Sequence, residues 1–410
     1  MNTLTSYPVL VGAVGAASAY YLLASSNAPP VQFTPAPVES SAAALDAVVD
    51  RVAQNAQKWV DVPFNRKLEY LREMLQIAVQ VADQIAGASD KVRGLEGTLF
   101  SGMGGIYSVG MTASYLRSII ELYETLSASG TPPAPVSVRA VGSGEVAVVA
   151  PRGVWQKVTN PTVVELWSAP GKKLTQAKTL QLHAGVCAVM SPGNFEAPVD
   201  VLHQLFLEGR VVVAKSHPLN AASSDVLSAA IFSSLARDGF VALAAGGPEV
   251  GARLLQNKQV DSWMMTGGCG TFDAIVWGGK AGKAAGKKQL AKTCHAELGA
   301  ASPYIVVPGA WNDKEMEEQT TALAGYKMFN SSHICASPQV IVVDRQWPLV
   351  KRFSDLLEEK LNTFPAIPAY YTGAQDRLAA IKQNCPSAHV LKANNFHFVP
   401  DVDAEGGGGS

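Results

Sequence analysis

The sequence predicts an α/β protein organised around a doubly wound, Rossmann-like parallel sheet. Two short β-branched runs bounded by turn residues, 185–190 and 210–214, have the pattern of buried strands. Between them, residues 197–207 carry apolar side chains at helical spacing. The order of strand, glycine-containing turn and helix returns at 240–256 and 261–270. Because a strand, a helix and a second strand in succession favour parallel pairing, this repetition predicts one parallel sheet covered by helices.

The chain is long enough for two or three domains, and its charge is nearly balanced. It has 410 residues, of which 48% are hydrophobic and 16% charged, and its net charge is −1. No basic block stands out, which argues against nucleic acid as a partner. The cysteines lack the paired spacing of zinc sites and redox motifs, which predicts free thiols in a reducing compartment and no metal site. They are Cys187, Cys269, Cys294, Cys335 and Cys385.

The N-terminal segment has the composition of a membrane anchor. Residues 1–38 carry no charged side chain, and the apolar stretch 7–24 is about as long as the shortest membrane spans. Tyrosines near both ends of this stretch resemble interfacial anchors. A signal peptide or an apolar tail is the alternative, although a signal peptide would need a positive start. We therefore expect a single anchor within residues 1–26, a membrane-associated protein, and a linker at 27–41.

Other elements follow from periodicity and from turn residues. Helices are predicted at 42–59, 67–86, about 109–127, 223–237, 312–329 and 349–361. Strands are predicted at 145–149, 153–158, 304–307 and 339–343, the first two as an antiparallel excursion. The Gly/Lys/Ala-rich segment 280–292 is expected at the surface.

One edge of the predicted sheet is expected to bind a ligand. The turn Ser191-Pro-Gly-Asn-Phe195 follows the first strand, and Lys215 ends the second. Open α/β sheets bind ligands at the carboxyl ends of their strands. A turn of small residues that opens a helix, with a cation nearby, suits a nucleotide cofactor. The glycine turns at 246–251 and 266–270 are weak evidence when each is taken alone.

Taken together, six motifs in order resemble the aldehyde dehydrogenase superfamily. They are SPGNF at 191–195 for SPWNF, VVAK at 212–215 for VVLK, GPEVG at 247–251 for GxxxG, MTGG at 265–268 for FTGS, ELGAASP at 297–303 for ELGGKSP, and NSSHIC at 330–335 for NxGQxC. The resemblance covers about residues 42–400. It implies N-terminal helices with a dinucleotide-binding domain at 42–292 and part of an α/β catalytic domain at 293–400. The ending Gly-Gly-Gly-Gly-Ser separately predicts a flexible tail at 401–410.

The resemblance implies NAD(P)-dependent oxidation of an aldehyde to a carboxylic acid. Cys335 would be the nucleophile that forms a thiohemiacetal and then a thioester. The Asn194 amide would stabilise the oxyanion, and Glu297 would be the general base that activates water. Because Glu297 lies in an apolar stretch of small residues, we expect it to be partly buried, with a raised pKa. The other four cysteines are expected to be packing residues.

The cofactor implied by the resemblance is NAD or NADP. The family's carboxylate for the ribose diol falls at Pro218, which leaves the choice between the two open. The implied cofactor-binding residues lie in the strand ends and glycine turns. They are Met190, Ser191, Gly193, Lys215, Gly247, Gly251, Thr266, Gly267, Gly268 and Leu298.

The sequence departs from the family pattern in ways that leave alternatives open. Gly193 replaces a Trp, Gly268 replaces a Ser, and Ser332-His333 replaces Gly-Gln. The family's ExFGP motif has no counterpart, so the catalytic domain is expected to be incomplete at its C-terminal end, and a homo-oligomer stays open. A catalytically degenerate protein that only binds ligands is one alternative. A CoA-linked acyl reductase that uses the same Cys335 is another.

Overall fold

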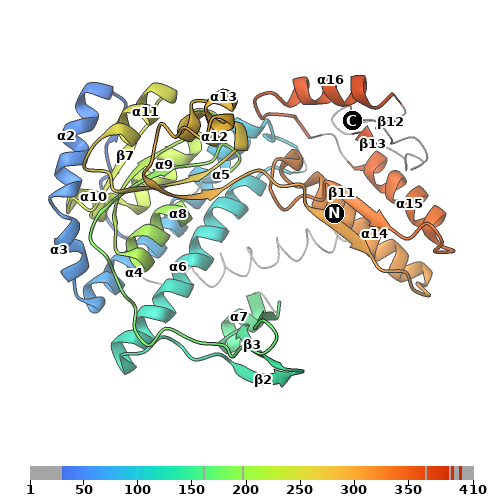
Figure 1. The fold of residues 1–410 in the computed structure, drawn as a ribbon, viewed down its shortest axis with the longest axis horizontal. Coiled ribbons are helices and arrows are strands. Elements are labelled where there is room, and N and C mark those ends of the chain that lie inside the picture. Colours follow the sequence, from blue (N-terminus) through green and yellow to red (C-terminus); the bar gives the residue numbers. More distant parts are fainter. Residues whose placement is uncertain are drawn as a thin grey trace. The chain divides into compact units, whose positions relative to one another are not determined.

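The computed structural model describes residues 30–98, 100–159, 162–195, 198–364, 367–386, 389–391 and 397–398. The chain forms two compact units, drawn in Figure 1. Among the described residues, the first unit contains 30–86 and 103–297, and the second contains 87–102 and those from 298 onward.

A six-stranded parallel sheet forms the centre of the first unit, in the order β1-β7-β6-β5-β8-β9. The middle strands are almost completely buried because helices cover both of their faces. This arrangement confirms the predicted doubly wound fold. The strands are β1 (Val38–Glu39), β5 (Val186–Met190), β6 (Val211–Lys215), β7 (Val241–Ala244), β8 (Ser262–Thr266) and β9 (Thr293–Glu297).

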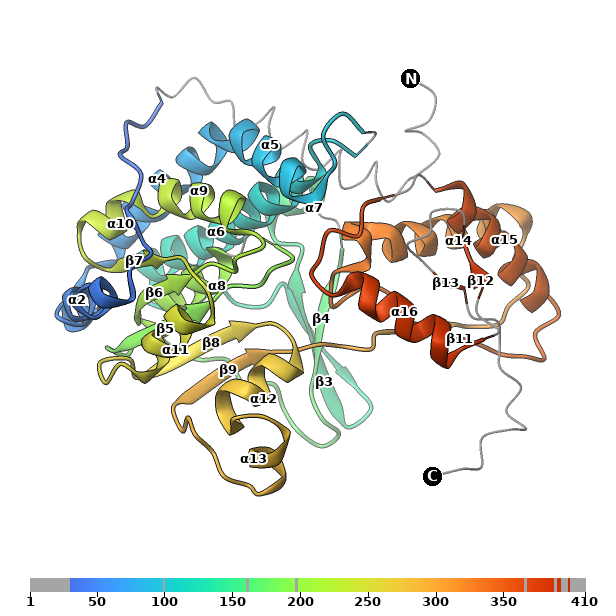
Figure 2. The same ribbon diagram turned by 90° about the horizontal axis from the view of Figure 1, so that it is seen from above.

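The helices of the first unit lie in two layers, one on each side of this sheet (Figure 2). One layer includes α4, α6, α8 and α9, which pack on one another, and the other includes α2 and α11. The helices are α2 (Ala42–Ala53), α3 (Ala56–Asp61), α4 (Phe64–Gln80), α5 (Ala82–Arg93, which continues into the second unit), α6 (Met103–Ser129), α8 (Pro198–His203) with the π-turn η2 (Gln204–Glu208), α9 (Ala221–Ile231), α10 (Ser233–Arg237), α11 (Pro248–Gln256), α12 (Cys269–Trp277) and α13 (Lys280–Ala284).

Several predicted helices are shorter than their periodicity suggested. The expected helix at 42–59 is divided into α2 and α3, and that at 67–86 into α4 and α5. The expected helix at 223–237 is likewise divided into α9 and α10. In each case the apolar spacing continues across the break, so the hydrophobic pattern alone does not mark where the backbone turns.

A three-stranded antiparallel sheet is formed by the part of the chain between β1 and β5. It comprises β2 (Ser137–Val141), β3 (Gly144–Ala150) and β4 (Val164–Trp167). The predicted strand at 153–158 is wrong, because α7 (Gly153–Thr159) occupies that segment. Gly153 has φ +58°, a conformation that ends the extended path of β3, and the Gln156 side chain accepts from the Arg152 N–H at 2.6 Å. The neighbours of β3 in the sheet are instead β2 and β4.

An aromatic cluster around Trp59 joins α3 to the main sheet. The Trp59 ring packs against Phe206 and Phe240, with ring centroids 5.2 and 4.9 Å away. Its Nε1–H donates to the Leu205 carbonyl at 2.8 Å, so its polar atom is satisfied inside the core. The Lys67 side chain is completely buried beside this ring and donates to the carbonyls of Val60 and Val62 at 3.1 and 2.7 Å.

The second unit contains a two-stranded parallel sheet, with helices between and after its two strands. Its strands are β10 (Pro303–Val306) and β11 (Val340–Val343), joined in register, and β12 (His389–Val390) with β13 (His397–Phe398), an antiparallel pair. Its other elements are α14 (Asp313–Met328), the turn η3 (Phe329–Ser332), α15 (Val350–Thr363) and α16 (Ala374–Asn384). A capping box at Asn312 and Glu315 starts α14, with both side chains bonded to backbone N–H groups.

The predicted membrane anchor is not supported. Across the part of the chain that the structure describes, no helix is long and apolar enough to cross a bilayer. Residues 1–26, which include the predicted span at 7–24, lie outside the described residues. The expected localisation at a membrane through a single anchor is therefore corrected on this finding.

Candidate functional site

The motifs of the first unit meet at the carboxyl edge of its parallel sheet. Met190 is paired with Lys215 on one side and with Met265 on the other. Thr266 is paired with Glu297 at the next position along this edge. Parallel strands in register end together, so segments up to about a hundred residues apart in sequence supply side chains to one edge.

Lys215 is held at this edge with its stem buried. Only 7% of the residue is exposed, and its Nζ donates to the Ser216 carbonyl at 3.0 Å. A Cβ at Gly251 would lie 3.6 Å from the Lys215 Cδ, so the glycine of α11 packs directly along the lysine stem. Burial lowers the pKa of Lys215, and the carboxylates of Glu249 and Asp225 oppose that shift.

The turn after β5 is fitted against His217. Gly193 is buried, and a Cβ built on it would lie 2.7 Å from the His217 Nδ1 and 3.0 Å from its Cγ. A bulky residue at 193 therefore has no room while this ring stays in place. Burial and then the charge of Lys215 lower the pKa of His217, which favours the neutral imidazole. The predicted oxyanion donor Asn194 follows Gly193 and is half-buried.

Two glycine turns open helices at the same edge. The Gly247 N–H donates to the Glu249 side chain at 3.0 Å at the start of α11. The Gly267 N–H donates to the Glu297 carbonyl at 2.9 Å, and Gly268 then precedes α12. A Cβ on Gly268 would meet nothing within 4 Å, so this helix start is open to an approaching group. Backbone N–H groups at such a start suit a phosphate.

Glu297 ends β9, an edge strand that was not predicted. The residue is exposed, so the expected burial is wrong. The apolar sequence around it suggested a core position, but an edge strand has a neighbour on one side alone, and β9 pairs with β8.

Asp200 is a carboxylate of this site that the sequence reasoning missed. It lies in the first turn of α8, and the Thr266 Oγ1 donates to its Oδ2 at 3.2 Å. Burial raises the pKa of Asp200, and the charge of Glu297 adds to the rise. An acidic residue in the first turn of a predicted helix was the available signal, but that pattern usually reflects the helix dipole.

The candidate nucleophile Cys335 belongs to the second unit. Its thiol is exposed, and the Ser302 Oγ donates to the Cys335 carbonyl at 2.6 Å. Cys187 is buried as predicted, and burial raises its pKa to about 12. Burial also raises the pKa of Cys294 to about 11. Cys269 was expected to pack but is exposed, because it starts α12 at the open edge of the sheet.

The predicted site residues are divided between the two units. The first unit holds Asn194, Glu297 and the proposed cofactor-binding residues up to Gly268, and it brings the strand ends together at one edge. Leu298 and Cys335 fall in the second unit. Among the described residues, no group of three or more His, Cys, Asp or Glu side chains is placed to hold a metal ion.

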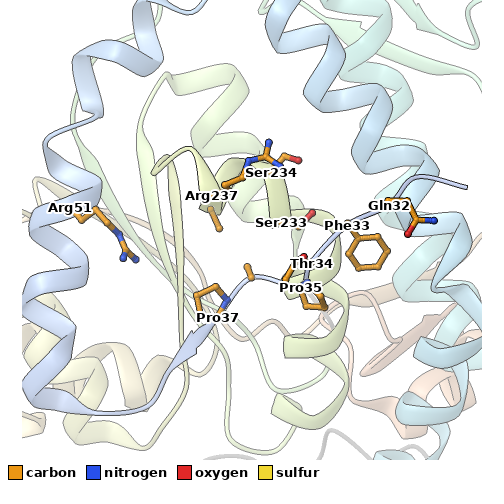
Figure 3. Close-up of a pocket in the computed structure, with 11 residues that line it drawn as sticks. Gln32, Phe33, Thr34, Pro35, Pro37, Arg51, Ser233, Ser234 and Arg237 are labelled. Atoms are coloured by element: carbon orange, nitrogen blue, oxygen red, sulfur yellow. The ribbon is translucent and has the colours of Figure 1, made fainter.

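A separate pocket of about 580 Å³ lies in the first unit between residues 32–37, α2 and α10 (Figure 3). Its polar lining includes Arg51, Ser233 and Arg237. Residues 32–37 precede β1, which runs parallel to β7, so the pocket lies toward the amino ends of these strands. None of the predicted site residues lines it.

Comparison with known proteins identifies the family. A model of the aldehyde dehydrogenase family matches residues 155–374, more than half of the chain. The chain therefore belongs to the aldehyde dehydrogenase family. A vanillin dehydrogenase from an Amycolatopsis species is 29% identical over 207 residues, which is 49% of this chain and 39% of that protein. The chain thus matches less than half the length of this curated relative.

Solved aldehyde dehydrogenases share the fold at low sequence identity. A lactaldehyde dehydrogenase has a TM-score of 0.59 at 16% identity, covering 88% of this chain and 69% of that one. A benzaldehyde dehydrogenase from Corynebacterium glutamicum has a TM-score of 0.59 at 15% identity, covering 86% and 67%. Aldehyde dehydrogenase C from Pseudomonas syringae, solved with NAD+ and octanal, has a TM-score of 0.57 at 16% identity, covering 92% and 72%.

Proposed function

We propose that this protein oxidises an aldehyde to a carboxylic acid with a nicotinamide dinucleotide, through a thioester on Cys335. The observation that carries the proposal is the strand register at the carboxyl edge of the sheet. That register sets Lys215, Met190 and Met265 side by side and pairs Thr266 with Glu297 one position further, at the edge where open α/β sheets bind nucleotides. Membership of the aldehyde dehydrogenase family and the exposed thiol of Cys335 give further support.

The residues of the chain divide the chemistry into two steps. The Cys335 thiolate attacks the aldehyde carbon, and its sulfur stays bonded to that carbon until water releases the acid. The Asn194 amide donates to the oxyanion that develops when the carbonyl becomes tetrahedral. Glu297 takes a proton from the water that then attacks the thioester. Its exposed position at the end of β9 leaves this carboxylate open to water.

The carboxyl edge fits a dinucleotide in two respects. The buried stem of Lys215 lies along Gly251 with its ammonium at the edge, where it would reach the ribose hydroxyls. The open N-terminus of α12 after Gly268 would take the pyrophosphate. When bound, the nicotinamide supplies the hydride acceptor that this reaction needs. NAD and NADP both remain candidates, since Pro218 provides no carboxylate for a ribose diol.

Exchange of Cys335 for alanine tests the assignment directly. Because the thiolate is the nucleophile, Cys335→Ala should reduce NAD(P)H formation to background, a loss of about a thousandfold or more. The substrates are short, long and aromatic aldehydes, including vanillin, followed by absorbance with each cofactor. Cys269→Ala is the matched control, because Cys269 is also an exposed thiol and should be dispensable for turnover.

Other outcomes separate the alternatives. Turnover that survives in Cys335→Ala would refute the assignment of the nucleophile. Cofactor binding without turnover in the wild-type protein would favour a degenerate binding protein. Acyl-CoA that forms only when CoA is added would favour the acyl reductase, in which Glu297 matters less.

A further inference from the structure

The segment that leads to Cys335 adopts a backbone conformation that few side chains favour. Asn330, Ser331 and Ser332 follow one another with φ of +47°, +52° and +64°. Left-handed conformations are costly for residues other than glycine, and three in succession persist only where neighbouring groups hold them. Side chains of the second unit hold this turn through hydrogen bonds.

Asn330 is the most strongly bonded residue of the turn. Its Oδ1 accepts from the Tyr370 hydroxyl at 3.0 Å and from the Arg93 Nε at 3.2 Å. Its Nδ2 donates to the His333 carbonyl at 3.2 Å, and the His333 N–H donates back to the Asn330 carbonyl at 2.9 Å. The Asn330 side-chain amide thus bonds within the turn through its Nδ2, and through its Oδ1 it bonds to two other segments, at Arg93 and Tyr370.

Arg93 and Tyr370 form a rigid support for that amide. Arg93 is 4% exposed and also donates to the Ser89 hydroxyl and carbonyl, so its guanidinium is fixed by its own helix. The guanidinium lies 5.4 Å from the centre of the Tyr370 ring, and the His333 ring meets the same ring edge-on at 5.4 Å. Arg93 and Tyr370, the two partners of the Asn330 Oδ1, are therefore themselves fixed by contacts with other side chains.

The serines of the turn are tied to the same surroundings. The Ser331 Oγ donates to the Pro368 carbonyl at 2.8 Å, and the Ser332 Oγ donates to the Lys327 carbonyl at 2.9 Å. Pro368 in turn packs close to Gly94, beside Arg93. Residues near 93 and 370 thus both contact the turn, and the Ser302 hydroxyl donates to the carbonyl of Cys335 itself.

We propose that Tyr370 is a positioning residue for the Cys335 nucleophile: by holding Asn330 in its left-handed conformation, together with Arg93, it fixes the backbone that carries the thiol. This inference rests on the proposed function, because it assumes that Cys335 reacts. Tyr370 acts through Asn330 and is assigned no contact with the substrate. Its effect therefore belongs to the rate of the chemical step and leaves substrate binding unchanged.

Tyr370→Phe and Tyr371→Phe form the test pair. Tyr370→Phe keeps the ring against Arg93 and His333 but removes the bond to Asn330. Tyr371→Phe removes a hydroxyl from the neighbouring ring, which also packs on His333, and leaves that bond in place. Loss of one hydrogen bond corresponds to a factor of about two to ten. We expect Tyr370→Phe to lower kcat by that factor with KM unchanged, and Tyr371→Phe to match the wild type.

Hydrogen exchange of the peptide spanning residues 327–337 tests the holding of the turn without any turnover. Exchange should become about two- to tenfold faster in Tyr370→Phe and stay at the wild-type rate in Tyr371→Phe. Asn330→Gly, which keeps access to positive φ but loses the amide, should show the same increase. Unchanged exchange in Tyr370→Phe would overturn the proposal, as would faster exchange with an unchanged kcat. A wild-type protein without turnover would refute the proposed function instead, and the exchange result would still decide whether Tyr370 holds the turn.

Discussion

At the scale of single residues, the carboxyl edge of the sheet contains a close fit between Gly193 and His217. The imidazole occupies the space that any side chain at 193 would need, and the His217 Nδ1 accepts from the Leu219 N–H at 3.2 Å. The glycine in place of the family's tryptophan is therefore part of a two-residue arrangement. The contact between Gly193 and His217 could not be predicted from the sequence. It depends on the pairing of β5 with β6, which brings the two strand ends together.

Exchange of Gly193 for alanine should destabilise the protein, because its Cβ would lie within 3 Å of three His217 ring atoms. Overpacking of this kind costs about 1–3 kcal/mol in the free energy of unfolding. The double variant Gly193→Ala/His217→Ala should recover most of that loss, since the second change removes the clash. Urea unfolding of the two single variants and the double variant measures the coupling. Additive effects would show that the two residues do not share this space.

The backbone conformation of the turn before Cys335 was the part of the site that the sequence predicted least well. The NSSHIC motif located Cys335, but nothing in Asn330, Ser331 or Ser332 predicted three left-handed residues in succession. Asparagine tolerates this conformation, whereas serine does so rarely. The turn depends on partners at Arg93 and Tyr370, which are 237 and 40 residues away from Asn330. Sequence spacing carries no information on such distant partners.

At the scale of elements, the end of α3 is capped by a buried lysine from α4. The Lys67 ammonium binds the carbonyls of Val60 and Val62, which would otherwise be unsatisfied at the end of the helix. Its position over the Trp59 ring, at 4.8 Å, adds a cation–π contact. The sequence predicted separate helices at 42–59 and 67–86, but it did not predict the role of Lys67, because a lysine in a predicted helix is normally solvated.

This buried lysine should give the protein a stability that rises with pH. Burial lowers the pKa of Lys67 to about 8, from 10.5 when it is solvated. Between these values the unfolded chain binds a proton that the folded protein lacks, so the free energy of unfolding increases as pH rises through that interval. Below about pH 8 both states are protonated, and the full cost of burying the charge is present. The maximal slope is about 1.4 kcal/mol per pH unit for one proton.

The variant Lys67→Met isolates the contribution of the buried ammonium to the pH dependence of stability. We expect the wild-type protein to gain about 1–2 kcal/mol relative to Lys67→Met between pH 8 and pH 9.5. Urea unfolding at several pH values within this range measures the difference. Lys314→Met is the control, because Lys314 is 84% exposed and should leave the pH dependence unchanged. A constant difference between wild type and Lys67→Met across the range would contradict the depressed pKa.

The buried strands of the main sheet and the strand at 145–149 were predictable, whereas β9 and α7 were not. The runs around 186–190 and 211–215 are buried on both faces, so their composition is almost entirely apolar and the pattern is unambiguous. By contrast, β9 contains Thr, Cys, His, Ala and Glu and is mostly exposed. It forms because β8 offers it a free edge, which is a property of the neighbouring strand. The helix α7 likewise replaced a strand that local composition favoured.

At the scale of the whole molecule, sequence motifs carried more information than periodicity. Six short motifs in order indicated the family that the family model then identified, although each motif alone is degenerate. Five of them lie at or directly after the carboxyl ends of strands of the main sheet, where open α/β sheets bind ligands, and NSSHIC belongs to the second unit. The N-terminal apolar stretch had no such context, and composition alone gave an expectation of membrane anchoring that the described helices do not support.

The division into two units leads to a prediction about ligand-dependent stability. The proposed dinucleotide contacts Lys215, Gly251 and Gly268 all belong to the first unit. A ligand that binds only the folded form stabilises it by about 2.7 kcal/mol at a hundred times its dissociation constant. NAD or NADP should therefore raise the unfolding temperature of the first unit and slow hydrogen exchange there, most clearly at the ends of β5, β6 and β8. Calorimetry with each cofactor in turn, combined with hydrogen-exchange mass spectrometry, measures both effects.

The variant Lys215→Met keeps an apolar stem against Gly251 and removes the ammonium. It should fold normally and lose most of the cofactor-dependent stabilisation, since the charge at the strand end is absent. Protection confined to the second unit would place the dinucleotide elsewhere. A response to NADP that exceeds the response to NAD would indicate that the edge near Lys215 and His217 accommodates a 2′-phosphate. The opposite order would indicate that some group other than residue 218 binds the ribose diol, since Pro218 offers no carboxylate.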